Sequence, residues 1–240
     1  MPFTISFRTL SKLTVGLSVG LAALAGQPAS ASVMDYSLDS YVGGGSMNLV
    51  SSPYGNVELN DNGGSNVTVT VTLSSGVGFV NTGAGYSLTW DLQGGPTIAV
   101  SALTTGFSLL SSSAGTVSAS GSGSWDYALT CDKDTCGTGG NAPYTGMLSF
   151  VVDNVGLSDF VANASGNYFS ADVCLGVSSG KCGAGGITGV IVAGIPPSTS
   201  DVPEPASMTL LAGSLGALAF FRRRAPLPPS SSMPPSIAAR

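Results

Sequence analysis

The chain has 240 residues, of which 43% are hydrophobic and only 9% are charged, and it contains no histidine. The absence of histidine excludes Ser-His-Asp and Cys-His catalysis and every metal site that uses histidine. Residues 32–200 carry eleven acidic side chains and two basic ones, Lys133 and Lys181, so their formal charge is −9. Such a surface does not attract phosphate backbones, and we expect no nucleic-acid partner.

The N-terminus has the pattern of a secretory signal peptide. A positively charged stretch precedes an uncharged run of small and aliphatic residues, 13–25, and an A-x-A site follows, formed by Ala29 and Ala31. Signal peptidase is the processing enzyme that such a pattern predicts, with residues 1–31 removed and Ser32 as the new N-terminus. The alternative is an uncleaved anchor, but the apolar run is short and the small-residue site favours cleavage.

Residues 32–193 alternate short apolar runs with Gly-rich breaks, about ten residues apart. The clearest run, 67–73, reads VTVTVTL, and its alternation predicts a strand with one valine face. Further strands are expected at 86–93, 97–103, 105–110, 116–120, 124–130, 146–155, 168–175 and 187–193. This pattern is typical of an all-β domain, an antiparallel β-sandwich or a jelly roll.

Two segments of the body and the linker that follows it depart from this pattern. A short helix is predicted at 157–162, where Ser158 and Asp159 supply a cap. Residues 35–62 are rich in Gly, Ser and Asn and are expected to be partly irregular. Residues 194–201 contain two prolines and small polar residues, which predicts an extended, exposed linker.

Four cysteines form two close pairs, and in an exported chain they are expected to be disulfides. Four cysteines allow three connectivities, of which we favour the local one, Cys131 with Cys136 and Cys174 with Cys182. A Cys-x4-Cys zinc knuckle is the competing interpretation, but histidine is missing and the second pair has a different spacing.

Candidate oxygen ligands and acid-base groups are few. Asp132 and Asp134 lie in the CDKDTC loop and are weak candidates for calcium, the alternative being a polar loop tip. Asp91, Asp126 and Asp153 lie in or beside predicted strands, and nothing in the sequence pairs them as a glycosidase requires. We therefore expect no enzymatic activity and no cofactor.

Five aromatic residues lie on or near predicted strands. Exposed rings stack against sugars in many β-sandwich modules, whereas buried rings belong to the core. The core is the favoured interpretation for each ring taken singly. The five are Tyr86, Trp90, Trp125, Tyr127 and Tyr144.

Near the C-terminus, residues 202–224 combine three unlike features in a fixed order. A Pro-Glu-Pro tripeptide is followed by sixteen uncharged residues, 206–221, and then by three arginines. This arrangement resembles the PEP-CTERM sorting signal of exported proteins in Gram-negative bacteria that make extracellular polysaccharide. The residues that carry the resemblance are Val202, Pro203, Glu204, Pro205, Arg222, Arg223 and Arg224.

The physical properties of this segment agree with a transient membrane helix. Sixteen helical residues span roughly 24 Å, which is short for a bilayer core of about 30 Å. The arginines favour a cytoplasmic C-terminal end, and the prolines place an extended strip at the outer boundary. Residues 225–240 form a Pro- and Ser-rich tail that we expect to be disordered.

The resemblance implies that an exosortase recognises and processes the chain. We expect an inner-membrane intermediate with a periplasmic body, followed by release to the cell surface or the exterior. The body is then a structural protein of the envelope or extracellular matrix, associated with exopolysaccharide and biofilm. The alternative is a carbohydrate-binding module sorted in the same way, and an exported hydrolase is the least favoured class.

Overall fold

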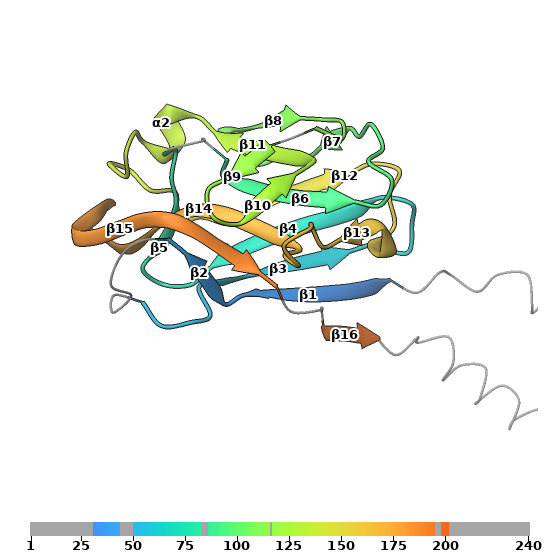
Figure 1. Cartoon of the computed structure of the whole chain (residues 1–240), viewed down its shortest axis with the longest axis horizontal. Coiled ribbons are helices and arrows are strands. Elements are labelled where there is room, and N and C mark those ends of the chain that lie inside the picture. The colour runs from blue at the N-terminus through green and yellow to red at the C-terminus, as the bar shows by residue number, and fades with distance from the viewer. Residues whose placement is uncertain (1–30, 44–49, 83–85, 116, 195–197, 202–240) are drawn as a thin grey trace, which may run out of the picture. The chain divides into compact units, whose positions relative to one another are not determined.

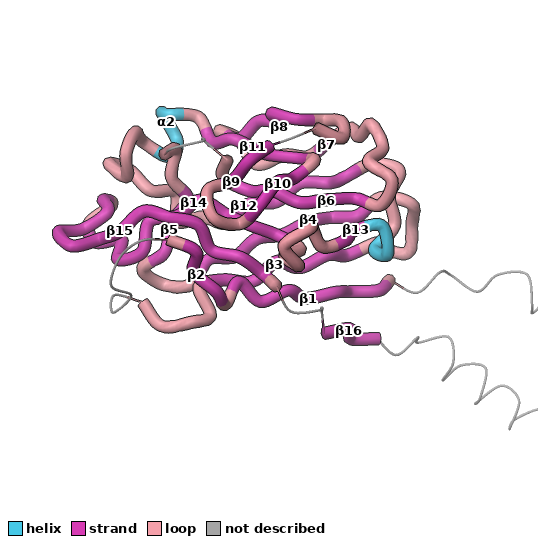
Figure 2. Tube along the Cα trace, viewed as in Figure 1, coloured by secondary structure: helices cyan, strands magenta, loops and turns pink. Residues whose placement is uncertain are grey.

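The computed structural model describes residues 31–43, 50–82, 86–115, 117–194 and 198–201. Figure 2 shows that they are mostly strand and loop, with helical turns only at α2 (Lys133–Cys136) and at the 3-10 turn η1 (Leu157–Asp159). All described strand pairs are antiparallel, so the predicted all-β antiparallel fold is confirmed. No helix of these residues is long and apolar enough to cross a membrane.

The first sheet has six strands and is built around the predicted alternating run. Strand β4 has the predicted bounds, and Val67, Val69 and Val71 are fully buried. The threonines between them point to the other face and stay partly exposed. The strand order is β16 (Ser198–Asp201), β1 (Ser32–Leu38), β3 (Gly55–Asn60), β4 (Val67–Leu73), β12 (Leu148–Val152) and β7 (Val100–Ser101).

The second sheet has eight strands, and its main order is β2 (Ser40–Val42), β15 (Lys181–Ala193), β14 (Phe169–Ser178), β6 (Leu88–Leu92), β11 (Tyr127–Cys131) and β8 (Phe107–Ser111). Two short strands extend it: β5 (Val77–Phe79) pairs with β14, and β13 (Phe160–Val161) pairs with β6. A separate hairpin is formed by β9 (Val117–Ala119) and β10 (Gly123–Trp125). Figure 1 shows this hairpin beside β6.

The two sheets share one hydrophobic core. Across the interface, the ring centroids of Trp90 on β6 and Phe150 on β12 are 5.3 Å apart. Those of Tyr36 on β1 and Phe169 on β14 are 5.1 Å apart in an edge-on arrangement. Aromatic pairs at such separations add to the energy of area burial, so these contacts tie one sheet to the other.

Several segments differ from their predicted structure. The predicted helix 157–162 is only a 3-10 turn, because Phe160 is buried and leaves the turn to pair with Leu92. Residues 35–62, predicted as partly irregular, contain β2, β3 and most of β1, with irregular backbone at Gly43 and at residues 50–54, so this prediction agrees with the structure. The predicted linker contributes β16, whose backbone pairs with β1.

The outer parts of the predicted architecture lie beyond the described residues. The signal peptide is described only at Ala31, and the membrane segment and the Pro- and Ser-rich tail are not described. The expectations for these segments therefore stay predictions.

Candidate functional site

The β9–β10 hairpin depends on a break in a segment that was predicted as one strand, 124–130. In an unbroken strand Trp125 and Tyr127 would share a face. Instead Trp125 lies in a small cluster with the hairpin, whereas Tyr127 lies in the main core. At the break the Asp126 N–H donates to Asp91 Oδ1 at 2.6 Å, and the Asp126 carbonyl accepts from Ser111 Oγ at 2.9 Å. Side chains thus replace the missing ladder bonds.

A buried polar network holds the hairpin on the outer face of the second sheet. Trp125 Nε1 donates to Ser122 Oγ at 3.2 Å, and this hydroxyl donates to Ser170 Oγ on β14 at 3.2 Å. Ser170 Oγ also pairs with Thr89 Oγ1 on β6 at 2.6 Å. Asn163 Nδ2 donates to the Ser122 carbonyl at 2.9 Å. Because these groups satisfy one another, polar atoms can be buried there without the usual desolvation penalty.

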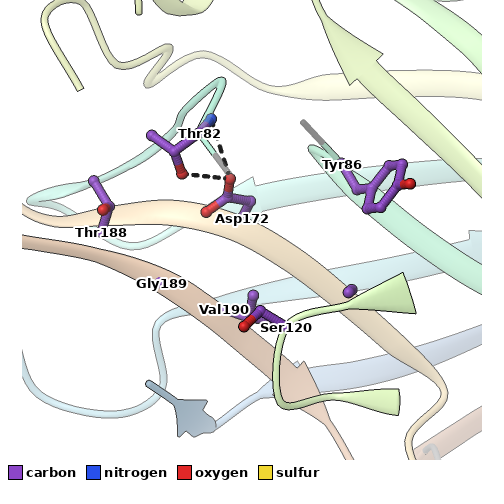
Figure 3. Close-up of a pocket in the computed structure, with 8 residues that line it drawn as sticks. Thr82, Tyr86, Ser120, Asp172, Thr188, Gly189 and Val190 are labelled. Atoms are coloured by element: carbon purple, nitrogen blue, oxygen red, sulfur yellow. Dashed lines mark hydrogen bonds between the residues drawn. The ribbon is translucent and has the colours of Figure 1, made fainter. Parts of the chain in front are cut away.

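A pocket of about 250 Å³ opens at the edge of this hairpin, and Figure 3 shows its residues. The hairpin supplies one wall, strands β14 and β15 supply the floor, and the segments that follow β5 and precede β6 supply the rest. The lining residues are Thr82, Tyr86, Ala119, Ser120, Asp172, Thr188, Gly189 and Val190.

Asp172 is the only ionisable carboxylate among those lining residues, and only 8% of its surface is exposed. Its Oδ2 accepts hydrogen bonds from Thr82 Oγ1 at 2.6 Å and from the Thr82 N–H at 3.3 Å. Burial raises the pKa of Asp172 from 3.8 to about 6, and the two bonds from Thr82 partly offset this rise. A carboxylate of raised pKa in a pocket is a typical feature of functional sites.

The structure brings together two of the three predicted carboxylates. Asp91 and Asp126 meet at the strand break, where burial raises the pKa of Asp91, the Asp126 N–H lowers it, and the charge of Asp126 raises it again. Asp153 follows β12 in the first sheet and accepts a bond from Ser101 Oγ at 3.2 Å. The Asp91 carboxylate accepts a backbone hydrogen bond at the break, which accounts for its partial burial.

The predicted calcium loop is a single helical turn. The Asp132 carbonyl accepts the N–H groups of Thr135 and Cys136, while the carboxylates of Asp132 and Asp134 belong to exposed residues. In the part of the chain that the structure describes, no group of three or more His, Cys, Asp or Glu side chains is placed to hold a metal ion. Two exposed carboxylates fall short of the six to eight oxygens that calcium takes.

Both predicted disulfides are present with the local connectivity. Cys131 is bonded to Cys136, and Cys174 to Cys182. The first bond joins the end of β11 to α2, and its two cysteines are buried. The second bond joins β14 to β15, where Cys174 is buried and Cys182 is partly exposed.

The aromatic candidates divide by burial. Trp90, Trp125 and Tyr127 are at most 1% exposed, so their rings cannot stack against a sugar in solution. Tyr86 and Tyr144 are partly exposed, and of these only Tyr86 lines the pocket. It packs against the small cluster under the hairpin.

Of the pocket residues, only Tyr86 was singled out from the sequence, as one of the aromatic candidates. The pairing of β14 with β5 and with β15, together with the docking of the hairpin, brings together residues that are separated in the chain: Thr82, Ser120, Asp172 and Thr188. One local signal was present, because Asp172 is a lone carboxylate inside the apolar run FSADVCLGV. A charged residue at such a position requires a partner or a ligand.

The described body is bounded by the two predicted processing points. Ser32, the predicted mature N-terminus, begins β1, and Asp201, which directly precedes Val202, ends β16. The two residues are partners in the β1–β16 ladder. Removal of both terminal segments would therefore leave every described strand intact.

Comparison with known proteins gives one result. A family model described as the PEP-CTERM protein-sorting motif matches residues 201–225. No curated protein and no solved structure matches the chain. The match covers every residue that carried the resemblance, from Val202 to Arg224, and the motif implies an exported chain that passes through a membrane and is processed by an exosortase. The chain is therefore a protein with a C-terminal PEP-CTERM sorting motif.

Proposed function

We propose that this chain is a structural protein of the cell envelope or extracellular matrix, delivered as an exosortase substrate and associated with exopolysaccharide. The observation that carries the proposal is the sorting motif at residues 201–225. The motif begins at the last residue of β16, so processing at the Pro-Glu-Pro strip separates the membrane segment from a complete β-sheet body. In this proposal the catalytic residues belong to the exosortase, and the chain contributes only the recognition strip.

The body supports a role outside the cytoplasm. Two disulfides close short loops beside strands of the second sheet, and such bonds persist in oxidising compartments. The low charge content and the many Ser, Thr, Asn and Gly residues suit a hydrated polysaccharide environment. The proposed path has an inner-membrane intermediate with a periplasmic body, followed by release to the surface.

The C-terminus of the mature protein tests this proposal. The protein is recovered from the envelope or medium of its native host, digested, and its terminal peptides are identified by mass spectrometry. We expect the N-terminus at Ser32 and no peptide from residues 206–240. Recovery of wild-type protein that still carries these residues would make the segment a permanent anchor.

A second candidate function is favoured by one specific observation, the pocket around Asp172. A carbohydrate-binding module sorted in the same way would use such a pocket. The pocket is separate from the sorting motif in the sequence, so binding and sorting can be tested independently.

A further inference from the structure

The pocket holds the buried carboxylate of Asp172, which has no cationic partner among the residues that the structure describes. Thr82 donates both of its bonds to Oδ2 of Asp172, and no described group donates to Oδ1. In Figure 3 this second oxygen points away from Thr82, into the space between Asp172 and Thr188. The basic residues of the described segments are Lys133 and Lys181, and neither lines the pocket. A buried anion without a counter-charge is costly, so this oxygen is suited to a cationic ligand.

The remaining walls provide hydroxyl groups and small apolar surfaces. Ser120 and Thr188 are exposed at the pocket mouth, on the hairpin and on β15. Ala119 and Val190 are buried and make the apolar part of the lining. Hydroxyls act both as donors and as acceptors, so they suit a ligand that carries several hydroxyls of its own.

The volume of the pocket and the number of its oxygen ligands limit the class of ligand that it can bind. Pockets for drug-sized ligands have volumes of about 300–1,000 Å³, so about 250 Å³ fits a single small ring. A bare divalent cation does not fit, because one carboxylate is far from the six to eight oxygens of a calcium site. The described residues also contain no group of three acidic or sulfur ligands. What remains is a small organic cation with hydroxyl groups.

We propose that this pocket binds one amino-sugar unit through its protonated amine, with Asp172 Oδ1 as the acceptor and the Ser120 and Thr188 hydroxyls beside the ring. An ammonium group supplies three donors and the missing positive charge, and the bond to a carboxylate is charge-assisted. The proposal rests on the second candidate function and names its ligand class. The source of the unit is either a free amino sugar or an amine-bearing residue of a polysaccharide.

Binding is measured on protein recovered from the expressing host, by saturation-transfer NMR and titration calorimetry. The probes are glucosamine, N-acetylglucosamine, glucose and ethanolamine, with a glucosamine oligomer as the polymer arm. A ligand this small is expected to bind with a Kd of about 1 mM. Glucosamine should bind at least about tenfold more tightly than the other three monomers, because only it combines the charge with the ring. If the oligomer binds more tightly than glucosamine, the source of the unit is a polysaccharide. If the two bind equally, the source is a free sugar.

The decisive variant is Asp172→Asn. With the amide oxygen facing the two donors of Thr82, the amide NH₂ replaces the free carboxylate oxygen, so the acceptor becomes a donor. Glucosamine binding should weaken by about tenfold or more. Asp153→Asn is the matched control, because it removes a carboxylate from the first sheet and should leave binding unchanged. A second variant, Thr188→Trp, places a large ring at an exposed position of the pocket and should abolish binding. It keeps the proposal testable if Asp172→Asn does not fold.

Three results would overturn the proposal: equal binding of glucose or N-acetylglucosamine, equal binding of ethanolamine, or no binding of any probe. Unchanged binding in the two pocket variants would also overturn it. None of these results affects the C-terminus of the mature protein, so a failed ligand assignment and a failed sorting proposal remain distinguishable.

Discussion

The Asp172 carboxylate makes the stability of the folded state depend on pH, with greater stability in mild acid. Its pKa is about 6 in the folded protein, against 3.8 for the unperturbed group, chiefly because of burial. The folded state therefore binds a proton more readily than the unfolded chain. The contribution of Asp172 to the free energy of unfolding is fully present below about pH 4 and is lost as the pH rises through about 6. Tyr41, whose raised pKa owes more to burial than to the charge of Asp172, ionises far above this range.

Replacement of Asp172 by Asn should remove this dependence. We expect the variant to be more stable than the wild type at pH 7, by at most about 3 kcal/mol for a shift of about two pKa units. The two profiles should converge near pH 4. Thermal unfolding between about pH 4 and 7 measures the effect, and parallel profiles for both proteins would show that Asp172 titrates normally.

A second residue-level prediction concerns the new N-terminus. The Ser32 nitrogen donates to Asp61 Oδ1 at 2.8 Å, and the Gly63 N–H donates to the same oxygen at 2.9 Å. Signal-peptide cleavage before Ser32 would turn the first donor into an ammonium group and the contact into a charge-assisted bond. We expect Asp61→Asn to destabilise the mature protein by about 1–2 kcal/mol.

The control for this contact is chemical. Acetylation of the Ser32 amine should destabilise the wild type but have little effect on Asp61→Asn, because the charge pair is already lost in that variant. Equal effects of acetylation on the two proteins would mean that the amine and the carboxylate do not interact.

The β9–β10 hairpin is attached to the second sheet by few groups, and Trp125 is the largest of them. It is 1% exposed and packs on Val117, Ala119 and Ala128. Trp125→Ala should cost about 3–5 kcal/mol and release the wall of the pocket. Leu110→Ala, at a site 54% exposed, is the control and should change little. Urea unfolding gives the stabilities, and backbone hydrogen exchange at 117–125 reports the attachment. A hairpin that stays protected after the tryptophan is removed would contradict this account.

The two disulfides should differ in their resistance to reduction. Both sulfurs of Cys131–Cys136 belong to buried residues, whereas Cys182 is partly exposed. Because a thiolate must reach a sulfur atom, a mild reductant should open Cys174–Cys182 first. Alkylation during stepwise reduction, followed by peptide mass spectrometry, gives the order. A disulfide that closes a loop this short stabilises the fold by about 2–3 kcal/mol in the chain-entropy model. Simultaneous opening of both bonds would show that global unfolding controls access.

The strand with strict alternation could be predicted from the sequence together with its bounds, whereas the division of a less regular segment could not. The run 67–73 is exact because each valine meets the core and each threonine faces outward. The segment 124–130 has the composition of one strand, yet it divides at Asp126. Its division depends on the Asp91 carboxylate, 35 residues away, which takes the Asp126 N–H. Strand propensity is a local property, so it cannot predict that a distant side chain takes a backbone hydrogen bond from the strand.

The disulfides were predictable for the same local reason, since each pair is close in sequence. The pocket was not, because it forms where β14, β15 and the hairpin meet. Asp172 and Thr82 are 90 residues apart, and only sheet pairing makes them neighbours. The burial of two aromatic candidates was also not predictable, because it depends on contacts that form only on folding. The hairpin covers Trp125, and the facing sheet covers Trp90.

For the molecule as a whole, the β1–β16 ladder relates the fold to the sorting pathway. Ser32 and Asp201 are partners in this ladder. The first residue after the predicted signal peptide and the last residue before the Val-Pro-Glu-Pro strip therefore lie side by side. A body attached at one end can fold completely while its terminal segments are still bound for the membrane. The motif match begins at Asp201 itself, which places the recognition strip directly after the sheet.

The last prediction separates retention from recognition in the sorting motif. Each arginine of Arg222–Arg224 costs about 2.5–3.5 kcal/mol at mid-membrane on insertion scales, so together they should stop the chain in transit. Replacing all three by serine should weaken retention and release unprocessed protein. Glu204→Ala should leave the segment inserted but uncut, because the uncharged run 206–221 is unchanged while the recognition strip is altered.

The readout for both variants is the C-terminal peptide and the membrane or medium fraction in which it is found. Ser207→Ala, inside the uncharged run, is the matched control and should be processed like the wild type, because it preserves the charge pattern and the Pro-Glu-Pro strip. If the serine variant is retained and cut normally, the arginines do not act as the stop. If Glu204→Ala is cut at the wild-type rate, the processing enzyme recognises the prolines or the helix and not the glutamate.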